Sequence, residues 1–425
     1  MTQKPEHTEK QPFTGYEKFL IFILAFTMFS VILDFMVMSP LGDMMMKSMQ
    51  LTTRQFGFAV SAYAFSAGLS GLMTAGFADR FDRKKLLLFF YTGFIAGTFF
   101  CGMANTYALM ITARIITGLF GGVIGSISMA IMTDIFPLHH RGRVMGFIQM
   151  GFGASQVLGV PIGIALANMW GWQSPFLMVG CISLIVALLI IWKMQPVTAH
   201  LAVQKDRSAF RHLWHTVSNA NYRIGFTATC LLSIGGFMMM PFGSAFAINN
   251  LHITTYQLPL LFMISGLSSL VIMPLIGKMS DKIDKFKIFV AASVWMMIMV
   301  LVYTHLGVTP LWIVMIMNIL MMMGIMSRMI PSGALMSSVP NMADRGAFMS
   351  INSSVQQIAG GIAAAFAGAI VIQKTKTSPL EHYDYLGYVI VVVSMICIVL
   401  LGRVNRMVKK KIAAAANENI QDKQV

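Results

Sequence analysis

Charged side chains are scarce in this sequence, at 11% of 425 residues, whereas a soluble globular domain carries about 25%. With 56% apolar residues, the chain cannot cover itself with water-compatible groups, which excludes an ordinary soluble domain. Apolar runs of roughly 18 or more residues are present instead, each long enough to cross a bilayer as a helix. The short alternating segments of a transmembrane β-barrel are absent. We therefore predict an all-α integral membrane protein.

Cysteine is also rare, and the spacings of metal or disulfide sites are missing. Cys101, Cys181, Cys230 and Cys397 all lie in apolar runs without a CxxC pattern, so we interpret them as small hydrophobic residues. The nine histidines lie at span ends, in loops or in the tails. No nucleophile–base pair or phosphate-cradling loop is evident. We expect no metal, no cofactor and no enzymatic activity.

The apolar segment after the polar N-terminus is too long for a signal-peptide core and lacks an A-x-A cleavage site, so we expect a retained first helix. Twelve spans are predicted, six before and six after a polar stretch at 195–222. The predicted organisation is an N-terminal six-helix bundle in 1–194, a cytoplasmic linker in 195–222 and a C-terminal six-helix bundle in 223–425. The spans are 17–39, 56–76, 85–104, 107–134, 143–167, 173–194, 223–247, 257–277, 287–306, 310–337, 345–372 and 384–405.

The net charge of +15 is spread in short clusters between the apolar spans. This distribution argues against nucleic-acid binding and for control of membrane orientation. With both termini on the cytoplasmic side, most cations between the spans fall inside. The exceptions, on the outer side, are Lys47, Arg54, Lys374 and Lys376. We therefore expect a multi-pass protein of the cytoplasmic (inner) membrane with both termini in the cytoplasm.

One basic phrase occurs twice, at residues 75–84 and 277–286, each time between two apolar spans. Both copies place a small residue four positions before an Asp and follow it with a cation, an apolar residue, a second Asp and another cation. Such a duplication indicates two homologous halves, which is typical of transporters built from repeats.

The first copy keeps Ala78, Asp79, Arg80, Arg83 and Lys84 of the pattern Gly-x-Leu-Ala-Asp-Arg-x-Gly-Arg-Lys. In this it resembles the major facilitator superfamily of transporters, and the resemblance extends over about residues 16–407. The chain departs from the pattern at Ala75, Phe77 and Asp82. Asp82 replaces a turn glycine, and Asp is one of the residues that tolerate a left-handed backbone.

Two further motifs add to the resemblance. Arg114, followed by Gly118 and Gly122, resembles the helix-4 arginine motif, and Gly159-Val160-Pro161-Ile162-Gly163 resembles the helix-5 motif of antiporters. The usual Gly-Pro pair and paired terminal glycines are missing from the latter. The glycine rows permit close helix contact, and Pro161 is expected to let its helix bend. The resemblance implies alternating access and favours export, as in proton-coupled drug and sugar efflux antiporters.

Asp34 is the one acidic residue placed well inside a predicted span, where a carboxylate is costly and usually marks a pathway or proton site. Arg114 lies at a matching depth in the antiparallel fourth span, at 1.5 Å per residue. We hypothesise that Asp34 carries the proton and that Arg114 is its electrostatic neighbour. The alternative is a static ion pair that locks helices 1 and 4, which in the family line the central cavity.

Arg328, in the tenth span, has no acidic partner within the spans. It either binds an anionic group of the substrate or is satisfied by helix carbonyls and water. Other polar residues inside the spans are candidates for substrate binding or for hydrogen bonds between helices. They are Gln149, Gln156, Asn318, Asn352, Gln356 and Gln357.

The resemblance implies a cytoplasmic charge cluster in which Asp79 and Arg83 meet an acid such as Asp134 and hold the inner gate shut. Arg80 belongs to the same copy, and Asp281 and Lys285 are the equivalents in the second. The alternative for the cations is simple orientation by positive charge. Because helix 10 lacks an acid matching Asp134, we expect the first copy to carry more of the switching.

These observations predict a secondary transporter that is driven by the proton gradient and exports a small organic solute, either a drug-like amphiphile or a sugar-like metabolite. Its expected partners are the solute, protons and membrane lipids, and we expect it to act as a monomer. An uptake symporter or uniporter of the same fold, or a non-transporting membrane receptor, are the alternatives. Substrate identity does not follow from the fold.

Overall fold

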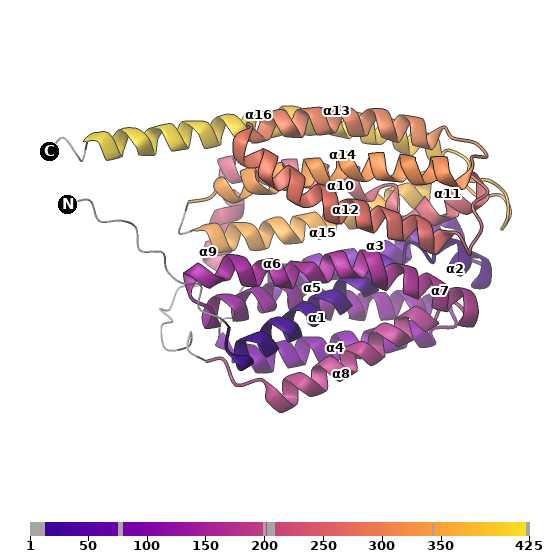
Figure 1. Ribbon diagram of the computed structural model, residues 1–425, viewed down its shortest axis with the longest axis horizontal. Helices are drawn as coiled ribbons and strands as arrows, with labels where there is room; N and C mark the ends of the chain where they lie inside the picture. The colour runs from indigo at the N-terminus through magenta and orange to yellow at the C-terminus, as the bar shows by residue number, and fades with distance from the viewer. Residues whose placement is uncertain (1–12, 75–79, 199–200, 202–208, 342–343, 422–425) are drawn as a thin grey trace.

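Figure 1 shows the computed structural model, which describes residues 13–74, 80–198, 201, 209–341 and 344–421. The helices run along the long axis of the molecule, and α1 begins at the same end of the bundle at which α16 finishes. We call this the terminal end, where the first helix begins and the last one finishes, and the opposite one the distal end. The described residues contain no strand, and their one β-bridge joins Ile372 to Glu381.

The N-terminal helices pack on one side of the molecule and the C-terminal helices on the other (Figure 1). The first group comprises α1 (Gly15–Val37), α2 (Gly42–Ser48), α3 (Thr53–Thr74), α4 (Arg83–Met103), α5 (Tyr107–Ile135), α6 (Leu138–Ala154), the π-helical turn η2 (Ser155–Gly159), α7 (Val160–Trp170) and α8 (Ser174–Lys193). The short α9 (Ala209–Ser218) follows. The second comprises α10 (Ala220–Phe237), the 3₁₀ turn η4 (Met240–Phe242), α11 (Gly243–Asn249), α12 (Leu258–Lys282), α13 (Lys285–Thr304), α14 (Leu311–Ser338), α15 (Arg345–Ile370) and α16 (Tyr383–Gln421).

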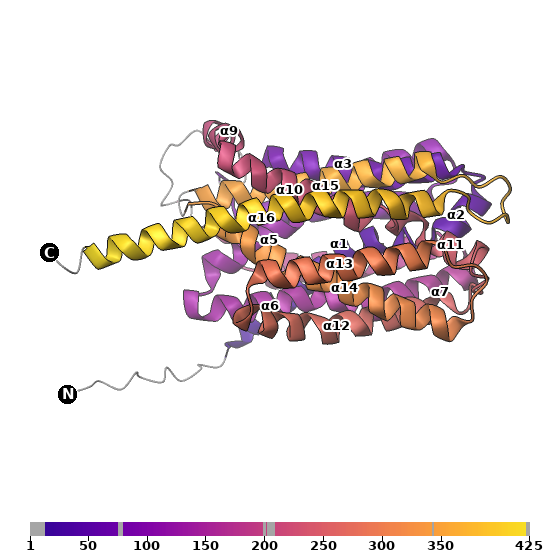
Figure 2. The same ribbon diagram turned by 90° about the horizontal axis from the view of Figure 1, so that it is seen from above.

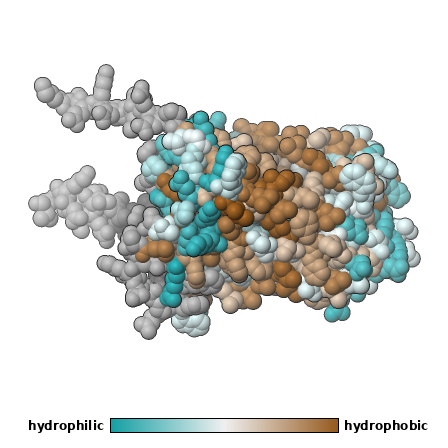
Figure 3. Space-filling model, turned by 90° about the horizontal axis from the view of Figure 1, so that it is seen from below, coloured by the Kyte–Doolittle hydropathy of each residue, from teal (hydrophilic) through white to brown (hydrophobic). Residues whose placement is uncertain are grey.

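Eleven helical segments of the described chain are long and apolar enough to cross a membrane. They correspond to all the predicted spans except 345–372. That region is the 26-residue helix α15, whose Ser, Asn and Gln side chains lower its hydropathy. It lies beside α3 along the contact between the two groups of helices (Figure 2). An apolar band separates two hydrophilic ends on the face shown in Figure 3.

Two spans that were predicted as continuous helices are interrupted. The fifth changes from α- to π-helical geometry at Ser155–Gly159, just before Pro161. Proline lacks the amide hydrogen that would bond to the carbonyl four residues earlier, and its ring displaces that carbonyl, which explains the wider turn. The seventh breaks at Pro241, in the turn between α10 and α11. A hydropathy pattern does not register either break.

Glycines of α5 let its backbone approach that of α3. A Cβ atom on Gly122 would lie 2.5 Å from the Cα atom of Ala67 and 2.6 Å from its carbonyl oxygen. Gly118 stands equally close to the backbone of Tyr63. Because neither backbone can yield as a flexible side chain does, both positions require glycine, in agreement with the predicted close contact.

Asp82 and Asp284, from the two copies of the basic phrase, each form the N-cap of the helix that follows. Asp82 Oδ1 accepts hydrogen bonds from the amides of Lys84 and Val197, at 2.9 and 3.0 Å. Asp284 accepts from the amide of Phe286, and its other oxygen pairs with Lys409 Nζ at 2.6 Å, which holds the pKa of that carboxyl below its usual range. With φ near −55°, Asp82 forms no left-handed turn, so its role is capping.

The α3–α5 contact predicts opposite signs for two Gly→Ala substitutions. In an exposed helix position such as Gly146, whose Cβ would meet nothing within 4 Å, alanine stabilises by about 0.5–1 kcal/mol. We expect Gly146→Ala to keep or raise the unfolding temperature of the purified protein and Gly122→Ala to lower it by several degrees. Equal effects of the two substitutions would contradict the close contact.

Candidate functional site

The ion pair predicted between the first and fourth spans, which are α1 and α5 in the structure, is present and buried. Asp34 of α1 is 0% exposed and Arg114 of α5 is 1% exposed. Arg114 Nη1 lies 2.8 Å from Asp34 Oδ2, and the hydroxyl of Thr98, from α4, donates to Asp34 Oδ1 at 3.3 Å. Three helices of the N-terminal group therefore meet at one carboxylate. Both the proton-carrier and the static-lock hypotheses remain compatible with this geometry.

Aromatic rings complete the surroundings of Arg114. Its guanidinium carbon lies 4.5 Å from the ring centre of Tyr63 and 6.0 Å from that of Phe176. Stacking on an aromatic face stabilises a desolvated arginine by about 2 kcal/mol. The Nε atom of Arg114 has no hydrogen-bond partner within the described chain. The guanidinium therefore relies on Asp34 and the rings to offset the loss of water.

The antiporter-like motif of the fifth span, which lies in η2 and α7, packs directly against the turn of α1 that carries Asp34. A Cβ atom on Gly159 would lie 2.7 Å from Leu33 Cδ1, and one on Gly163 would lie 3.0 Å from Val37 Cγ2. Leu33 and Val37 flank Asp34 in the sequence. The motif therefore contacts α1 at the position of Asp34, a contact that the sequence pattern alone did not indicate.

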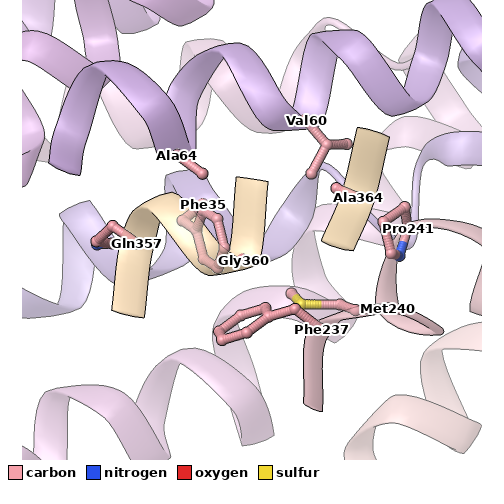
Figure 4. A pocket seen from close by; sticks show the side chains of 9 residues that line it. All are labelled: Phe35, Val60, Ala64, Phe237, Met240, Pro241, Gln357, Gly360 and Ala364. Atoms are coloured by element: carbon pink, nitrogen blue, oxygen red, sulfur yellow. The ribbon is translucent and has the colours of Figure 1, made fainter. Parts of the chain in front are cut away.

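A small pocket, with room for about one water molecule, lies between the N-terminal and C-terminal helices (Figure 4). In the figure, α3 runs above it with Val60 and Ala64, Phe237 and Met240 lie below, and Gln357 and Pro241 stand at opposite ends. Its lining consists of Phe35, Val60, Ala64, Phe237, Met240, Pro241, Gln357, Gly360 and Ala364.

Asp34 and Arg114 do not line this pocket. Aromatic contacts join the two places instead. The ring of Phe35, which lines the pocket, lies 5.4 Å from that of Tyr63 and 6.0 Å from that of Phe237. Tyr63 in turn stacks on Arg114. The position of Phe35 directly after Asp34 was the sequence signal for this connection.

Polar contacts close the distal end between the two groups of helices. The hydroxyl of Ser39 donates to the carbonyl of Met240, and that of Ser244 donates to the carbonyl of Ser39 at 2.8 Å. Asp43 accepts from Asn249 Nδ2 at 2.6 Å and pairs with Lys47 at 2.8 Å. We call these six residues the distal seal.

A second internal repeat underlies this seal and went unnoticed in the sequence. Ser39-Pro40-Leu41-Gly42 ends the first span and Met240-Pro241-Phe242-Gly243 ends the seventh. Both prolines follow a residue of the seal and both glycines open a short helix. The other hydrogen bonds found between the two groups in the described chain also lie in its distal half, such as Thr53–Val371, Ser61–Gly361 and Asn168–Thr255.

At the terminal end, Arg83 and Asp134 meet as the resemblance implied, with Nε and Oδ2 3.1 Å apart. Asp79 lies outside the described residues, and Arg80 is exposed. In the second copy, Asp281 lies in the last turn of α12 and Lys285 begins α13. Elsewhere at the terminal end, the hydroxyl of Tyr222 donates to Asp344 at 2.8 Å. The shares of the two copies in switching stay a prediction.

Arg328 is 2% exposed and lies among α13, α14 and α16, away from the pocket. Its Nη1 contacts the sulfur of Met296 at 2.8 Å, and its guanidinium carbon is 5.5 Å from the ring centre of Phe289. Nε and Nη2 have no hydrogen-bond partner within the described chain. The structure therefore offers this cation no carboxylate, and it does not bring Arg328 to the pocket.

The six amide candidates separate into different environments. Gln357 lines the pocket, whereas Gln149 is exposed and Gln356 is half-buried outside it. Asn318 donates to the carbonyl of Val314 within α14, whereas Asn352 accepts from Thr229 of α10 at 2.7 Å and so joins two helices. Gln156 lies in the π-helical turn with a buried carbonyl oxygen that has no partner in the described chain.

The family model described as Major Facilitator Superfamily matches residues 24–364 and 226–419, and the chain belongs to this family. It is similar to the uncharacterized MFS-type transporter YceJ of Bacillus subtilis (strain 168), at 27% identity over 65% of this chain and 70% of the relative. A probable sugar efflux transporter of Helicobacter pylori (strain G27) is 26% identical over 43% of this chain. The chain spans about half (47%) of that relative's length.

Solved transporter structures share the fold. A D-xylose-proton symporter superposes with a TM-score of 0.74 over 90% of this chain and 97% of the other, at 16% identity. A bacterial homolog of the human lysosomal transporter Spinster, in an inward-facing and unoccupied conformation, gives 0.73 over 94% and 99%, at 14% identity. The protein is therefore a multi-pass membrane protein with the transporter fold of this family.

Removing one member of the buried ion pair should be much worse than removing both. Arg114→Met leaves the Asp34 carboxylate buried without its partner, and we expect a loss of about 3–5 kcal/mol in stability. The double variant Asp34→Leu/Arg114→Met removes the stranded charge and should recover most of the loss in a thermal-unfolding assay. A double variant as unstable as Arg114→Met would show that the two side chains are not energetically coupled.

For Arg328 we expect the opposite change in stability. Because its buried guanidinium has unsatisfied donors, Arg328→Met should raise stability by about 1–3 kcal/mol, the cost of burying an unsatisfied polar group. Arg328→Lys keeps the charge but loses the planar stacking on Phe289, so it should lower stability. Thermal unfolding of the purified variants measures both. A destabilised Arg328→Met variant would show that the arginine has a stabilising partner in the folded protein.

Proposed function

We propose that the protein is a proton-coupled antiporter that exports a small organic solute across the cytoplasmic (inner) membrane, with its terminal end in the cytoplasm. The observation that carries the proposal is the Asp34–Arg114 pair. Asp34 is the one fully buried carboxylate in the described membrane-spanning segments. Such a group is retained in a membrane protein mainly where it serves a pathway or a proton site.

The geometry supports competition between proton and solute. Protonation of Asp34 neutralises the partner of Arg114, which keeps its own charge and must then seek Tyr63 or water. A solute that enters between the two groups of helices would contact Phe35, whose ring packs on Tyr63. The bound solute thereby holds Tyr63 and Arg114 in the arrangement that favours the ionised form of Asp34. Solute binding releases the proton and proton binding releases the solute, which is the requirement for antiport.

Alternating access would open and close the two ends in turn. The distal seal and the contact of α3 with α15 close the distal end in this structure. Opening that end requires Ser39, Asp43 and their partners to separate. We propose that the charge cluster of Arg83 and Asp134 then helps to hold the terminal end shut. The π-helical turn before Pro161 supplies a place where the fifth span bends.

Export is the proposed direction because the helix-5 glycines pack beside Asp34 and because relatives include proteins named as sugar efflux transporters and a multidrug resistance protein. In this proposal the protein acts as a monomer among membrane lipids and needs no cofactor beyond the proton gradient. Proton-coupled uptake would use the same residues, so flux in right-side-out and inside-out vesicles distinguishes the two directions.

Asp34→Asn tests the proton role in reconstituted vesicles. The amide keeps the size of the side chain but cannot exchange a proton, so we expect solute counterflow without a gradient to persist. Flux driven by an imposed pH gradient should fall at least tenfold. A panel of labelled sugars and amphiphiles identifies the transported solute first. Glu381→Gln, whose carboxylate pairs with the exposed Lys374, provides a carboxylate control away from the ion pair and the distal seal. Undiminished pH-driven flux in Asp34→Asn would exclude Asp34 as the proton carrier.

A further inference from the structure

We propose that a cavity at the distal end binds a phosphate group and thereby holds that end closed. This distal cavity has a volume of about 180 Å³ and lies between the turn from α2 to α3 and the loop from α15 to α16, which are neighbours in Figure 2. Because one wall belongs to each group of helices, an occupant contacts both groups. The binding stands apart from antiport, and only the effect on closure rests on the alternating access proposed above.

Three of the four cations expected on the outer side meet at this cavity. Its lining includes Lys47, Lys374 and Lys376, whereas Arg54 is not part of it. None of the described residues that line the cavity is acidic. Cations are uncommon on the outer side of a membrane protein, and like charges around one space repel each other. An anion between the lysines replaces this repulsion by attraction.

The three lysines differ in how firmly they are held. Lys374 Nζ lies 2.7 Å from Glu381 Oε1, but both side chains are largely exposed, and such surface pairs contribute little. Lys47 pairs with the buried Asp43 as part of the distal seal. Lys376 is exposed and has no ion-pair partner within the described chain. Lys374 and Lys376 are therefore free to turn toward an anion, and Lys47 adds a fixed positive charge.

Neutral donors surround the same space. Thr52 and Thr53 line it at the start of α3, where the first turn leaves backbone amides without helical acceptors and carries the positive end of the helix dipole. Gln50 and Gln373 contribute side-chain amides. At about 30 Å³ for each water molecule, the cavity holds several waters, which is enough room for a phosphate group. Several donors around a compact space suit an oxyanion with several acceptor oxygens.

Contacts beside the cavity fix both of its walls. Ile372 and Glu381 exchange two backbone hydrogen bonds, of 3.2 and 2.8 Å, which close the loop that carries Lys374 and Lys376. The hydroxyl of Thr53 donates to the carbonyl of Val371 at 2.6 Å and joins the two groups of helices. Opening the distal end separates these two residues and takes the cavity apart. A ligand that binds only the intact cavity therefore favours the closed end by mass action.

Inorganic phosphate and a matched set of variants test the site. With the protein in lipid-free detergent and chloride keeping the ionic strength constant, phosphate should raise the unfolding temperature in a saturable way. Lys376→Gln and Lys374→Gln should each weaken the apparent affinity about fivefold, the upper range for an exposed ion pair. Arg54→Gln removes the same charge next to Thr53 but outside the lining, and should change the affinity less than about twofold.

Three results would overturn the site. Equal stabilisation by chloride would show general screening of charge. Equal weakening by Arg54→Gln would show that overall charge, and not the lining, attracts phosphate. An affinity that is unchanged in a folded Lys374→Gln/Lys376→Gln variant would show that phosphate binds elsewhere.

Nanodiscs distinguish a lipid headgroup from a soluble phosphate. In phosphatidylcholine alone, inorganic phosphate should stabilise the protein as it does in detergent. In a mixture with phosphatidylglycerol, loss of this response assigns the cavity to the phosphate of the anionic lipid, whereas a retained response assigns it to the soluble anion. In either case Lys376→Gln should reduce the stabilisation by the source identified, and a source that stabilises this variant fully would contradict the assignment.

Distances across the distal end test the closure. Spin labels on non-natural amino acids, which spare the native cysteines, can replace the exposed Asn105 after α4 and Val308 after α13. Saturating phosphate should shift the distance distribution toward its shorter component in the wild-type background, and not in Lys374→Gln/Lys376→Gln. An unchanged distribution at a phosphate concentration that saturates binding would overturn the closing role.

Flux measured in phosphate-free buffer and zwitterionic lipid separates this inference from the proposed function. Phosphate binding and distal closure without any pH-driven flux would reject antiport and leave the anion site standing. Flux that depends on Asp34, in a protein that fails to bind phosphate from either source, would reject the anion site and leave antiport standing.

Discussion

The ion pair between Asp34 and Arg114 is the constraint on which the rest of the structure depends. Burying two charges between membrane helices costs several kcal/mol per ion, and only close geometry with further polar or aromatic contacts offsets it. That requirement determines which faces of α1, α4 and α5 meet. It also explains why helix 5 carries glycines opposite the residues that flank Asp34, and why α3 must approach α5 closely enough for its tyrosine ring to cover the guanidinium.

The two groups of helices carry related sequence repeats but differ in how their buried charges are paired. The N-terminal group contains the buried ion pair of Asp34 and Arg114. The C-terminal group buries Arg328, which has no carboxylate partner among the described residues. Both contribute to the pocket and to the distal seal, where the repeated proline and glycine positions meet. The pocket lies between α1 on one side and the break of the seventh span on the other. Phe35, which lines the pocket, packs on Tyr63, and Tyr63 in turn stacks on Arg114.

Much of this architecture could be predicted from the sequence because the bilayer imposes simple rules. Hydropathy located the spans, and the rarity of charges inside them singled out Asp34 and Arg114, whose equal depths predicted the contact. The remaining features of the site depend on how each helix is rotated about its axis and on contacts between the two groups of helices. Gln356 and Gln357 are neighbours, yet they point about 100° apart on the helix, and only packing decides which one lines the pocket. Asp82 became a cap because a helix begins at the next residue, a boundary that hydropathy does not resolve.

The central claim is that Asp34 exchanges its proton in response to the solute. Infrared difference spectroscopy of the reconstituted protein measures this directly, because a protonated carboxyl group has a carbonyl band that a carboxylate lacks. If Asp34 carries the proton, acidification produces a band that is missing in Asp34→Asn, and adding a bound ligand at constant pH removes it. A carboxyl band that persists unchanged on ligand binding, or that is still present in Asp34→Asn, would contradict the account.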